Sequence, residues 1–422
     1  MRAERARPLA RSAAGAFVLV LVLCLLAVLT SSSRSSRSRL PESANPTDFS
    51  LGPADRSSPG DSLVSATTLV RHLDVPWGVT FVPDGGALVT ERQNLRILKV
   101  GPQRRPNGEL TVSTVATITE AYSNNEGGLL GIAASPQFAR DNTVFIFYTT
   151  RDDNRIARLR LGGRPVPILT GIPHAGVHNG GRLMFGPDGY LYATTGDASR
   201  AGFSQDLNDL GGKILRMTTD GKPPPGNPFP HSLVWSYGHR NPEGLAWDGE
   251  GHMYAAEIGE AVWDELNVIL PGRNYGWPEV EGIGLEPGYV DPIVTWRPEV
   301  GVSDGVVIVG RVAVVTCLRG QRIYLVSLNQ MVTTGLSSRQ VEGVGIGTAS
   351  IRWRPGAGVA SRPIEALTGR YGRLRAAIRA PDGSVWITTS NRDGRNHVTP
   401  DDDRILRLTL HPASTGPSTT PH

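Results

Sequence analysis

A histidine stands directly before two glycines in the string HNGGRL, residues 178–183. Glycine lets the backbone bend sharply, so we expect the imidazole of His178 to be exposed on a loop. An imidazole titrates near neutral pH and suits a general base that removes a proton from a substrate hydroxyl. A loop histidine can equally be structural, and this string alone leaves both interpretations open.

A second string, GHRNPEGLAW, occupies residues 238–247. Arg240 offers a planar guanidinium and Asn241 an amide, while Pro242 restricts the backbone that follows them. Together these groups suit a planar ligand rich in oxygen atoms. The alternative is that Arg240 only hydrogen-bonds to carbonyls of its own loop.

Two further strings could bind ions. In EIGEAVWDELN, residues 257–267, a glycine-containing acidic loop can present backbone carbonyls to a hard cation such as Ca²⁺, although its polar side chains could instead cap the loop. In GRLRAA, residues 372–377, Arg373 and Arg375 alternate and therefore share one face of a predicted strand. Two cations on one face attract an anion, unless that face is simply solvated.

Short alternating strands, not long helices, surround these strings. From residue 67 onward the chain repeats an apolar run, a turn rich in Pro, Asp or Gly, and an alternating run. The six units are FVPDGGALVTE (81–91), AASPQFARDNTVFIFYT (133–149), MFGPDGYLYATTGD (184–197), LAWDGEGHMYAAEIG (245–259), VVIVGRVAVVTCL (306–318) and IRAPDGSVWITTS (378–390). A composition of 50 glycines and 32 prolines agrees with many tight turns.

This repeat predicts an all-β fold, a six-bladed β-propeller with four-stranded antiparallel blades. The loops between blades would then meet at one end of the central channel and bring the four strings together. The alternative fold is a pair of β-sandwiches with coincidental turns. Residues 329–365 match the strand pattern poorly, which predicts a long loop or a diverged blade.

The N-terminal segment has the pattern of an export signal. Several arginines precede the apolar stretch 13–30, so residues 1–32 are interpreted as a signal peptide or an N-terminal membrane anchor. The body would then be secreted or held at the outer face of the cytoplasmic membrane. We expect a flexible linker at 33–66, the propeller at 67–411 and a disordered tail at 412–422.

Charge and cysteine content argue against nucleic-acid binding and exclude sites built from several cysteines in the body of the chain. The net charge is +4, but residues 1–40 hold seven arginines against one glutamate, so the rest of the chain is slightly acidic. No cluster of basic residues interrupts the body, which argues against nucleic-acid binding. Only Cys317 lies outside the apolar stretch, so the body can form neither an internal disulfide nor a cysteine metal cluster.

Taken in order, these strings resemble the soluble glucose and sorbosone dehydrogenases, six-bladed propellers that use pyrroloquinoline quinone (PQQ). The resemblance runs from about Leu69 to Leu410. It is carried by VPWGVTFVPDG, EGGLLGIAASPQF, HNGGRLMFGPDGYLYATTGD, GHRNPEGLAW, WDELNVILPGRNYGWP and GRLRAAIRAPDG. It implies a dehydrogenase of aldose sugars or polyols that passes electrons to an acceptor in the cell envelope.

The resemblance also implies residue roles. His178 would be the general base, Arg240 and Asn241 would contact the quinone oxygens, and Glu126 would line the substrate side. The remaining implied ligands of the cofactors are Arg373 and Arg375 for the PQQ carboxylates, Arg319 as a further basic residue, and the carbonyls of Gly259 and Glu260 for Ca²⁺.

Two other functions stay open at this point. A non-catalytic extracellular propeller could use the same face to bind carbohydrate or protein, since fold alone does not decide function. A Ca²⁺-dependent hydrolase such as a lactonase would need carboxylates and amides around a metal in the channel. The candidates here are carbonyls and arginines, which suit an anionic planar cofactor better.

Overall fold

Tight hairpins are the repeating unit of the structure, a computed structural model that describes residues 58–298, 301–328 and 362–411. In the PDG turns the aspartate accepts a hydrogen bond from a backbone N–H two residues later: Asp188 from Tyr190 at 3.2 Å and Asp382 from Ser384 at 3.0 Å. The intervening glycines, Gly189 and Gly383, have φ of +79° and +82°, which side chains disfavour. Local turn chemistry therefore sets the hairpins.

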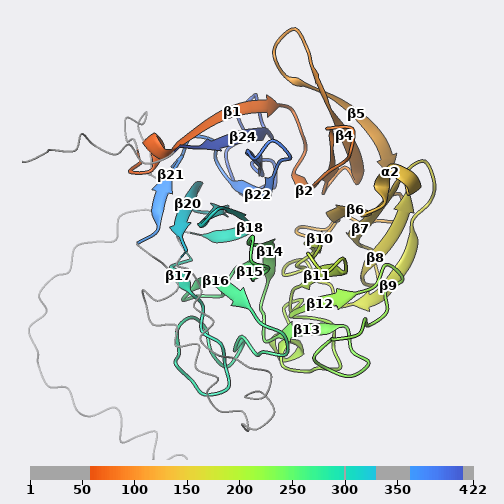
Figure 1. Ribbon diagram of the computed structural model, residues 1–422, viewed down its shortest axis with the longest axis vertical. Helices are drawn as coiled ribbons and strands as arrows, with labels where there is room; N and C mark the ends of the chain where they lie inside the picture. Colours follow the sequence, from red (N-terminus) through yellow and green to blue (C-terminus); the bar gives the residue numbers. More distant parts are fainter. Residues whose placement is uncertain (1–57, 299–300, 329–361, 412–422) are drawn as a thin grey trace, which may run out of the picture. The chain divides into compact units, whose positions relative to one another are not determined.

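The described strands form six four-stranded sheets arranged as blades around a centre (Figure 1). Blade 1 comprises β2 (Pro76–Phe81), β3 (Ala87–Glu91), β4 (Arg96–Arg104) and β5 (Leu110–Thr117). Blade 2 comprises β6 (Leu129–Ala134), β7 (Thr143–Thr149), β8 (Asn154–Arg160) and β9 (Val166–Ile172). Blade 3 comprises β10 (Leu183–Phe185), β11 (Leu191–Thr195), β12 (Lys213–Met217) and β13 (Val234–Tyr237). Blade 4 comprises β14 (Pro242–Trp247), β15 (Met253–Glu257), β16 (Asp264–Ile269) and β17 (Val294–Trp296). Blade 5 comprises β18 (Val302–Val309), β19 (Val312–Cys317), β20 (Arg322–Ser327) and β21 (Ile364–Ala366). The predicted fold class, a six-bladed propeller with four-stranded antiparallel blades, is confirmed.

Blade 6 closes the ring with strands from both ends of the described chain. It comprises β22 (Leu374–Arg379), β23 (Val385–Thr389), β24 (Ile405–Leu410) and β1 (Val64–Val70). β1 runs antiparallel to β24, with Val64 opposite Leu410. The expected propeller start at residue 67 thus falls inside β1, because the first strand is needed to complete the last blade.

Helical structure is confined to short pieces. The 3₁₀ helix η1 spans Asp61–Leu63, α2 spans Phe138–Asp141 and η2 spans Ala201–Ser204. Within the described ranges no helix has the length and hydropathy needed to cross a membrane. The predicted export segment and tail, and most of the irregular stretch 329–365, lie outside the described residues, although that stretch ends in β21.

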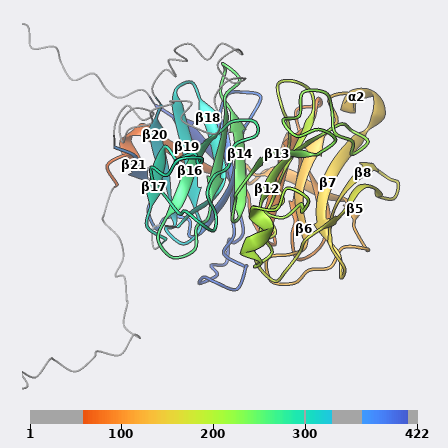
Figure 2. The same ribbon diagram turned by 90° about the horizontal axis from the view of Figure 1, so that it is seen from below.

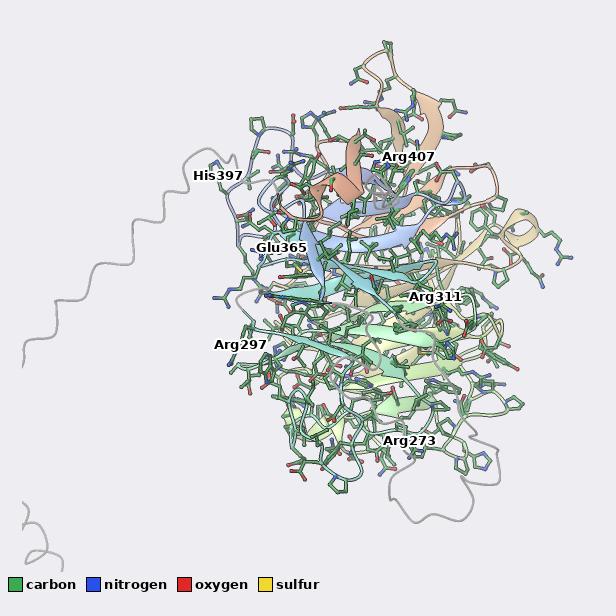
Figure 3. All side chains as sticks on the ribbon, turned by 60° about the vertical axis from the view of Figure 1, so that its left-hand side comes forward. Arg273, Arg297, Arg311, Glu365, His397 and Arg407 are labelled. Carbon is green, nitrogen blue, oxygen red and sulfur yellow. The ribbon has the colours of Figure 1, made fainter. Side chains whose placement is uncertain are left out.

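The apolar core is divided among the blade interfaces. One cluster joins Tyr254 and Leu266 of blade 4 to Val315 and Val326 of blade 5, and comparable clusters lie between the other neighbouring blades. Figure 2 shows the strands side by side with loops at both ends. Arg407 of β24 lies on the periphery, where it forms an ion pair with Asp382 at 2.7 Å (Figure 3). Burial between blades, not within one blade, therefore holds the ring together.

Candidate active site

Chain direction places the predicted site residues at one end of the channel, here called the site end. The innermost strands β2, β6, β10, β14, β18 and β22 come first in each blade, and they are followed by antiparallel partners. Loops that precede innermost strands therefore lie at the same end as loops between the second and third strands. The predicted residues all fall in these two sets of loops or at the adjoining strand ends.

His178 lies in the loop before β10, with φ of +59°. Its Nδ1 is 2.8 Å from Oδ1 of Asp197, which follows β11. The side chain is 18% exposed, so the imidazole is less open than its loop position predicts. An ionised aspartate accepts a hydrogen bond from Nδ1–H, and this tautomer leaves Nε2 as a proton acceptor.

The carboxylate of Asp197 is held by several donors. Trp277 Nε1 donates to Oδ2 at 2.9 Å, and the backbone N–H of Ser199 donates to Oδ1 at 2.8 Å. Burial raises the pKa of Asp197, but the hydrogen bonds from His178, Trp277 and Ser199 outweigh it, and the net pKa lies below its usual value. Asp197 is therefore a stable carboxylate that orients the imidazole.

Glu126, before β6, connects the histidine loop to blade 6. Its Oε2 accepts the backbone N–H of His178 at 3.0 Å, and its Oε1 pairs with Arg395 at 2.6 Å. Arg395 also donates to Asn125 Oδ1 at 3.0 Å. The predicted substrate-side residue is thus fixed beside His178 by a contact that spans two blades.

Arg240 lies between β13 and β14 and reaches the carbonyls of the next loop. Its guanidinium donates to Gly259 O at 2.7 Å and Ile258 O at 3.2 Å, and it lies 5.5 Å from the ring centroid of Trp277. Arg240 Nε is buried and has no hydrogen-bond partner among the residues that the structure describes. The guanidinium therefore keeps a donor for a ligand.

The loop after β15 presents carbonyls on one side and backbone N–H groups on the other. Glu281 Oε1 accepts the N–H groups of Glu260, Ala261, Val262 and Trp263 at 2.7–3.3 Å. In the described part of the chain, no group of three or more His, Cys, Asp or Glu side chains is placed to hold a metal ion. A cation at this loop would therefore depend on the carbonyls of Gly259 and Glu260.

Asn241 is engaged at both ends of its amide. Oδ1 accepts the N–H of Gly180 at 2.9 Å, and Nδ2 donates to Glu243 Oε1 at 2.8 Å. The other oxygen of Glu243 lies 3.2 Å from Arg375. Glu243 therefore links the amide of blade 4 to the arginine pair of blade 6.

Arg373 and Arg375 converge on one carboxylate, as their shared strand face predicts. Asp393, in the loop after β23, lies 2.9 Å from Arg373 Nε and 3.9 Å from Arg375. Arg375 Nε also donates to Ser390 Oγ at 3.0 Å. These side chains are 2–8% exposed, so the arginines form a desolvated basic cluster whose charge is partly balanced by Asp393 and Glu243.

Arg319 stands apart from the other predicted residues. It lies after β19, is exposed, and packs its Cβ next to Gly301. No hydrogen bond or ion pair joins it to the rest of the site in the described residues.

A cavity of about 270 Å³ lies in the channel, and none of the predicted site residues lines it. Its lining residue Arg182 donates from Nε to Glu243 O at 2.8 Å, which connects the cavity wall to the site.

Sequence reasoning missed several residues that organise the site: Asp197, Glu243, Trp277 and Asp393. Asp197 and Glu243 are part of strings that were singled out, TTGD and GHRNPEG, and an acid beside a basic motif is a usable signal. Trp277 is also part of a string that was singled out, WDELNVILPGRNYGWP. Asp393 carries no such local signal, because its arginine partners lie on a different strand.

Behind this site, two glutamates face each other across neighbouring strands. Glu265 of β16 pairs in register with Glu257 of β15, and Asn267 Nδ2 donates to Glu265 Oε2 at 3.0 Å. Burial, and then the charge of Glu257, raise the pKa of Glu265 to about 8. The native state therefore holds a proton that the unfolded chain, where the glutamate has its ordinary pKa of 4.5, has released.

This difference predicts a pH-dependent stability. Between about pH 5 and pH 8 the native chain binds more protons than the unfolded chain, so stability falls as pH rises. In Ca²⁺-free buffer, Glu265→Gln should remove most of this slope and stabilise the protein by about 2–4 kcal/mol at pH 8. Thermal unfolding at several pH values checks this, and a wild-type profile without that slope would contradict it.

Comparison with known proteins adds a family. Residues 73–400 match the model of the glucose/sorbosone dehydrogenase family. A solved structure of PQQ-bound aldose sugar dehydrogenase from Streptomyces coelicolor is 39% identical, covers 84% of this chain and 100% of its own, and superposes with a TM-score of 0.73.

Two curated relatives show the same relationship. Aldose sugar dehydrogenase YliI of Escherichia coli is 31% identical over 57% of this chain and 72% of its own length. Quinoprotein glucose dehydrogenase B of Acinetobacter calcoaceticus is 30% identical over 57% of this chain and 58% of its own length.

Proposed function

The chain belongs to the glucose/sorbosone dehydrogenase family, and from this premise we propose that it is a PQQ- and Ca²⁺-dependent dehydrogenase of aldose sugars or related polyols. The observation that carries the proposal is the His178–Asp197 pair together with a desolvated basic cluster, Arg373 and Arg375, at the same end of the channel. A proton acceptor beside an anion-binding surface suits oxidation of an alcohol by an anionic redox cofactor.

His178 would take the proton of the substrate hydroxyl. Asp197 engages Nδ1, so Nε2 would accept that proton. Asp197 also stabilises the imidazolium that forms, since its carboxylate remains ionised. When bound, PQQ would supply the quinone that accepts the hydride from the carbon that carries this hydroxyl. Glu126, which accepts a hydrogen bond from the backbone of His178, would contact further sugar hydroxyls.

The residues present fit a planar polycarboxylate. Within the described residues Arg240 has a buried Nε donor without a hydrogen-bond partner, and Arg373 and Arg375 are buried arginines at the same end of the channel. Such guanidinium groups recognise carboxylates in their own plane. Arg240 and Asn241 would hold the quinone oxygens, while Arg373 and Arg375 would hold the carboxylates.

Calcium would bind at the carbonyls of Gly259 and Glu260. Gly259 O already accepts a hydrogen bond from Arg240, and a carbonyl oxygen has a second lone pair for a cation. An anionic cofactor would supply the remaining negative oxygens. The proposal extends to an exported protein that delivers its electrons to an acceptor in the cell envelope, which the N-terminal arginines and apolar stretch support.

A binding titration of the purified chain tests this function. With Ca²⁺ present, we expect PQQ to bind saturably by absorbance and to raise the melting temperature, and aldoses to bleach the oxidised cofactor. Arg240→Ala should raise the Kd for PQQ about 10- to 100-fold, because a charge-assisted contact is lost.

Arg311→Ala is the matched control, since Arg311 is exposed in the turn after β18 (Figure 3). A folded wild-type chain that binds no PQQ at any accessible concentration would overturn the enzyme proposal and favour a propeller that binds carbohydrate or protein.

A further inference from the structure

Arg92 is a buried arginine at the site end that none of the roles above uses. It directly follows β3, so it lies in a loop between second and third strands, as Asp197 and Asp393 do. The residue is 2% exposed, and its Nε is buried without a hydrogen-bond partner in the part of the chain that the structure describes. In the described ranges its side chain has no carboxylate at ion-pair distance.

The backbone fixes Arg92 where two blades meet. Its N–H donates to Val75 O at 3.1 Å, and its carbonyl accepts the N–H of Leu129 at 3.2 Å. Gly128 has φ of +150°, and a Cβ there would overlap the Arg92 carbonyl and crowd its Cγ. The close approach of this glycine holds the stem of the arginine in place.

The acidic side chains whose charges act on Arg92 already have other ion-pair partners. Asp393, Glu126 and Glu243 each act on Arg92 electrostatically. Asp393 pairs with Arg373, Glu126 with Arg395, and Glu243 with Arg375. Burial, and then the charge of Arg375, lower the pKa of Arg92 to about 10, which still leaves it cationic at neutral pH.

An ionised guanidinium is costly to bury without a counter-charge. The neighbouring Arg375 adds to that cost, because like charges repel more strongly between buried side chains. Such an arrangement is best explained by an anion that arrives with a ligand. The polycarboxylate proposed for this site has the required charge and would pair with several arginines at once.

We propose that Arg92 is a further cofactor-binding residue, whose guanidinium binds a carboxylate of PQQ alongside Arg373 and Arg375. The proposal rests on the proposed function. It assigns blade 1 a direct part in cofactor binding, in addition to the residues that blades 3, 4 and 6 supply.

Removing an unpaired buried cation should have opposite effects with and without cofactor. We expect Arg92→Met to leave the melting temperature of the cofactor-free chain unchanged or raised, and to raise the Kd for PQQ about 10- to 100-fold in absorbance titrations with Ca²⁺. Arg92→Lys should recover part of the affinity, because it restores the charge but not the planar fork.

Arg216→Met is the matched control, since Arg216 is also buried but pairs with Asp188 near the other end of the channel. It should lower the melting temperature and leave the Kd for PQQ unchanged. A wild-type Kd in folded Arg92→Met overturns this inference alone. A wild-type chain that binds no PQQ overturns both this inference and the proposed function.

Discussion

Replacing His178 with alanine is expected to lower kcat for aldose oxidation about 10³-fold while PQQ remains bound. Removal of a general base lowers the rate by about this factor, because the hydroxyl proton then has no acceptor as the hydride leaves. Binding should be retained because the imidazole is engaged with Asp197 and belongs to no basic cluster. Stopped-flow reduction of the bound quinone measures the chemical step directly.

Two variants separate this role from a structural one. Asp197→Asn keeps the side-chain shape but removes the charge that orients Nδ1–H, so we expect about a 10²-fold loss of kcat. His231→Ala, in an exposed position between β12 and β13, should have wild-type kcat. A reduction rate within a few-fold of wild type in cofactor-loaded His178→Ala would contradict the assignment.

The Arg375→Met variant is expected to lose both stability and cofactor affinity. Its guanidinium faces two buried carboxylates, Glu243 at 3.2 Å and Asp393 at 3.9 Å. Removing one partner of a buried ion pair leaves uncompensated charge, so the free energy of unfolding without cofactor should fall by about 3 kcal/mol. The Kd for PQQ should rise about 100-fold, because a desolvated carboxylate contact is lost.

Denaturant unfolding and PQQ titration measure the two effects. Arg379→Met is the control on the same strand, since Arg379 is exposed at the far end of β22. Unchanged stability in Arg375→Met would contradict the ion-pair network. The contrast with Arg92→Met is informative, because one variant removes a paired arginine and the other an unpaired one.

The repeat and most site loops could be predicted because their signals are local. The Asp–Gly turns, as at Asp188 and Gly189, form hydrogen bonds within a few residues, and strand alternation shows which face is buried. The ring closure could not be placed to the residue in this way. Strand β1 joins β24 across nearly the whole described chain, so no local pattern marks its start.

By itself, the sequence determined the six hairpin units, the blade number and the shared end at which His178, Arg240 and Arg373 lie, since each follows from turn chemistry and chain direction. Only the tertiary structure decided which charges meet. Glu126 contacts Arg395, which is 269 positions away in the chain, and Glu243 contacts Arg375, which is 132 positions away. Those pairings, and the absence of one for Arg92 in the described residues, depend on the geometry of the closed ring.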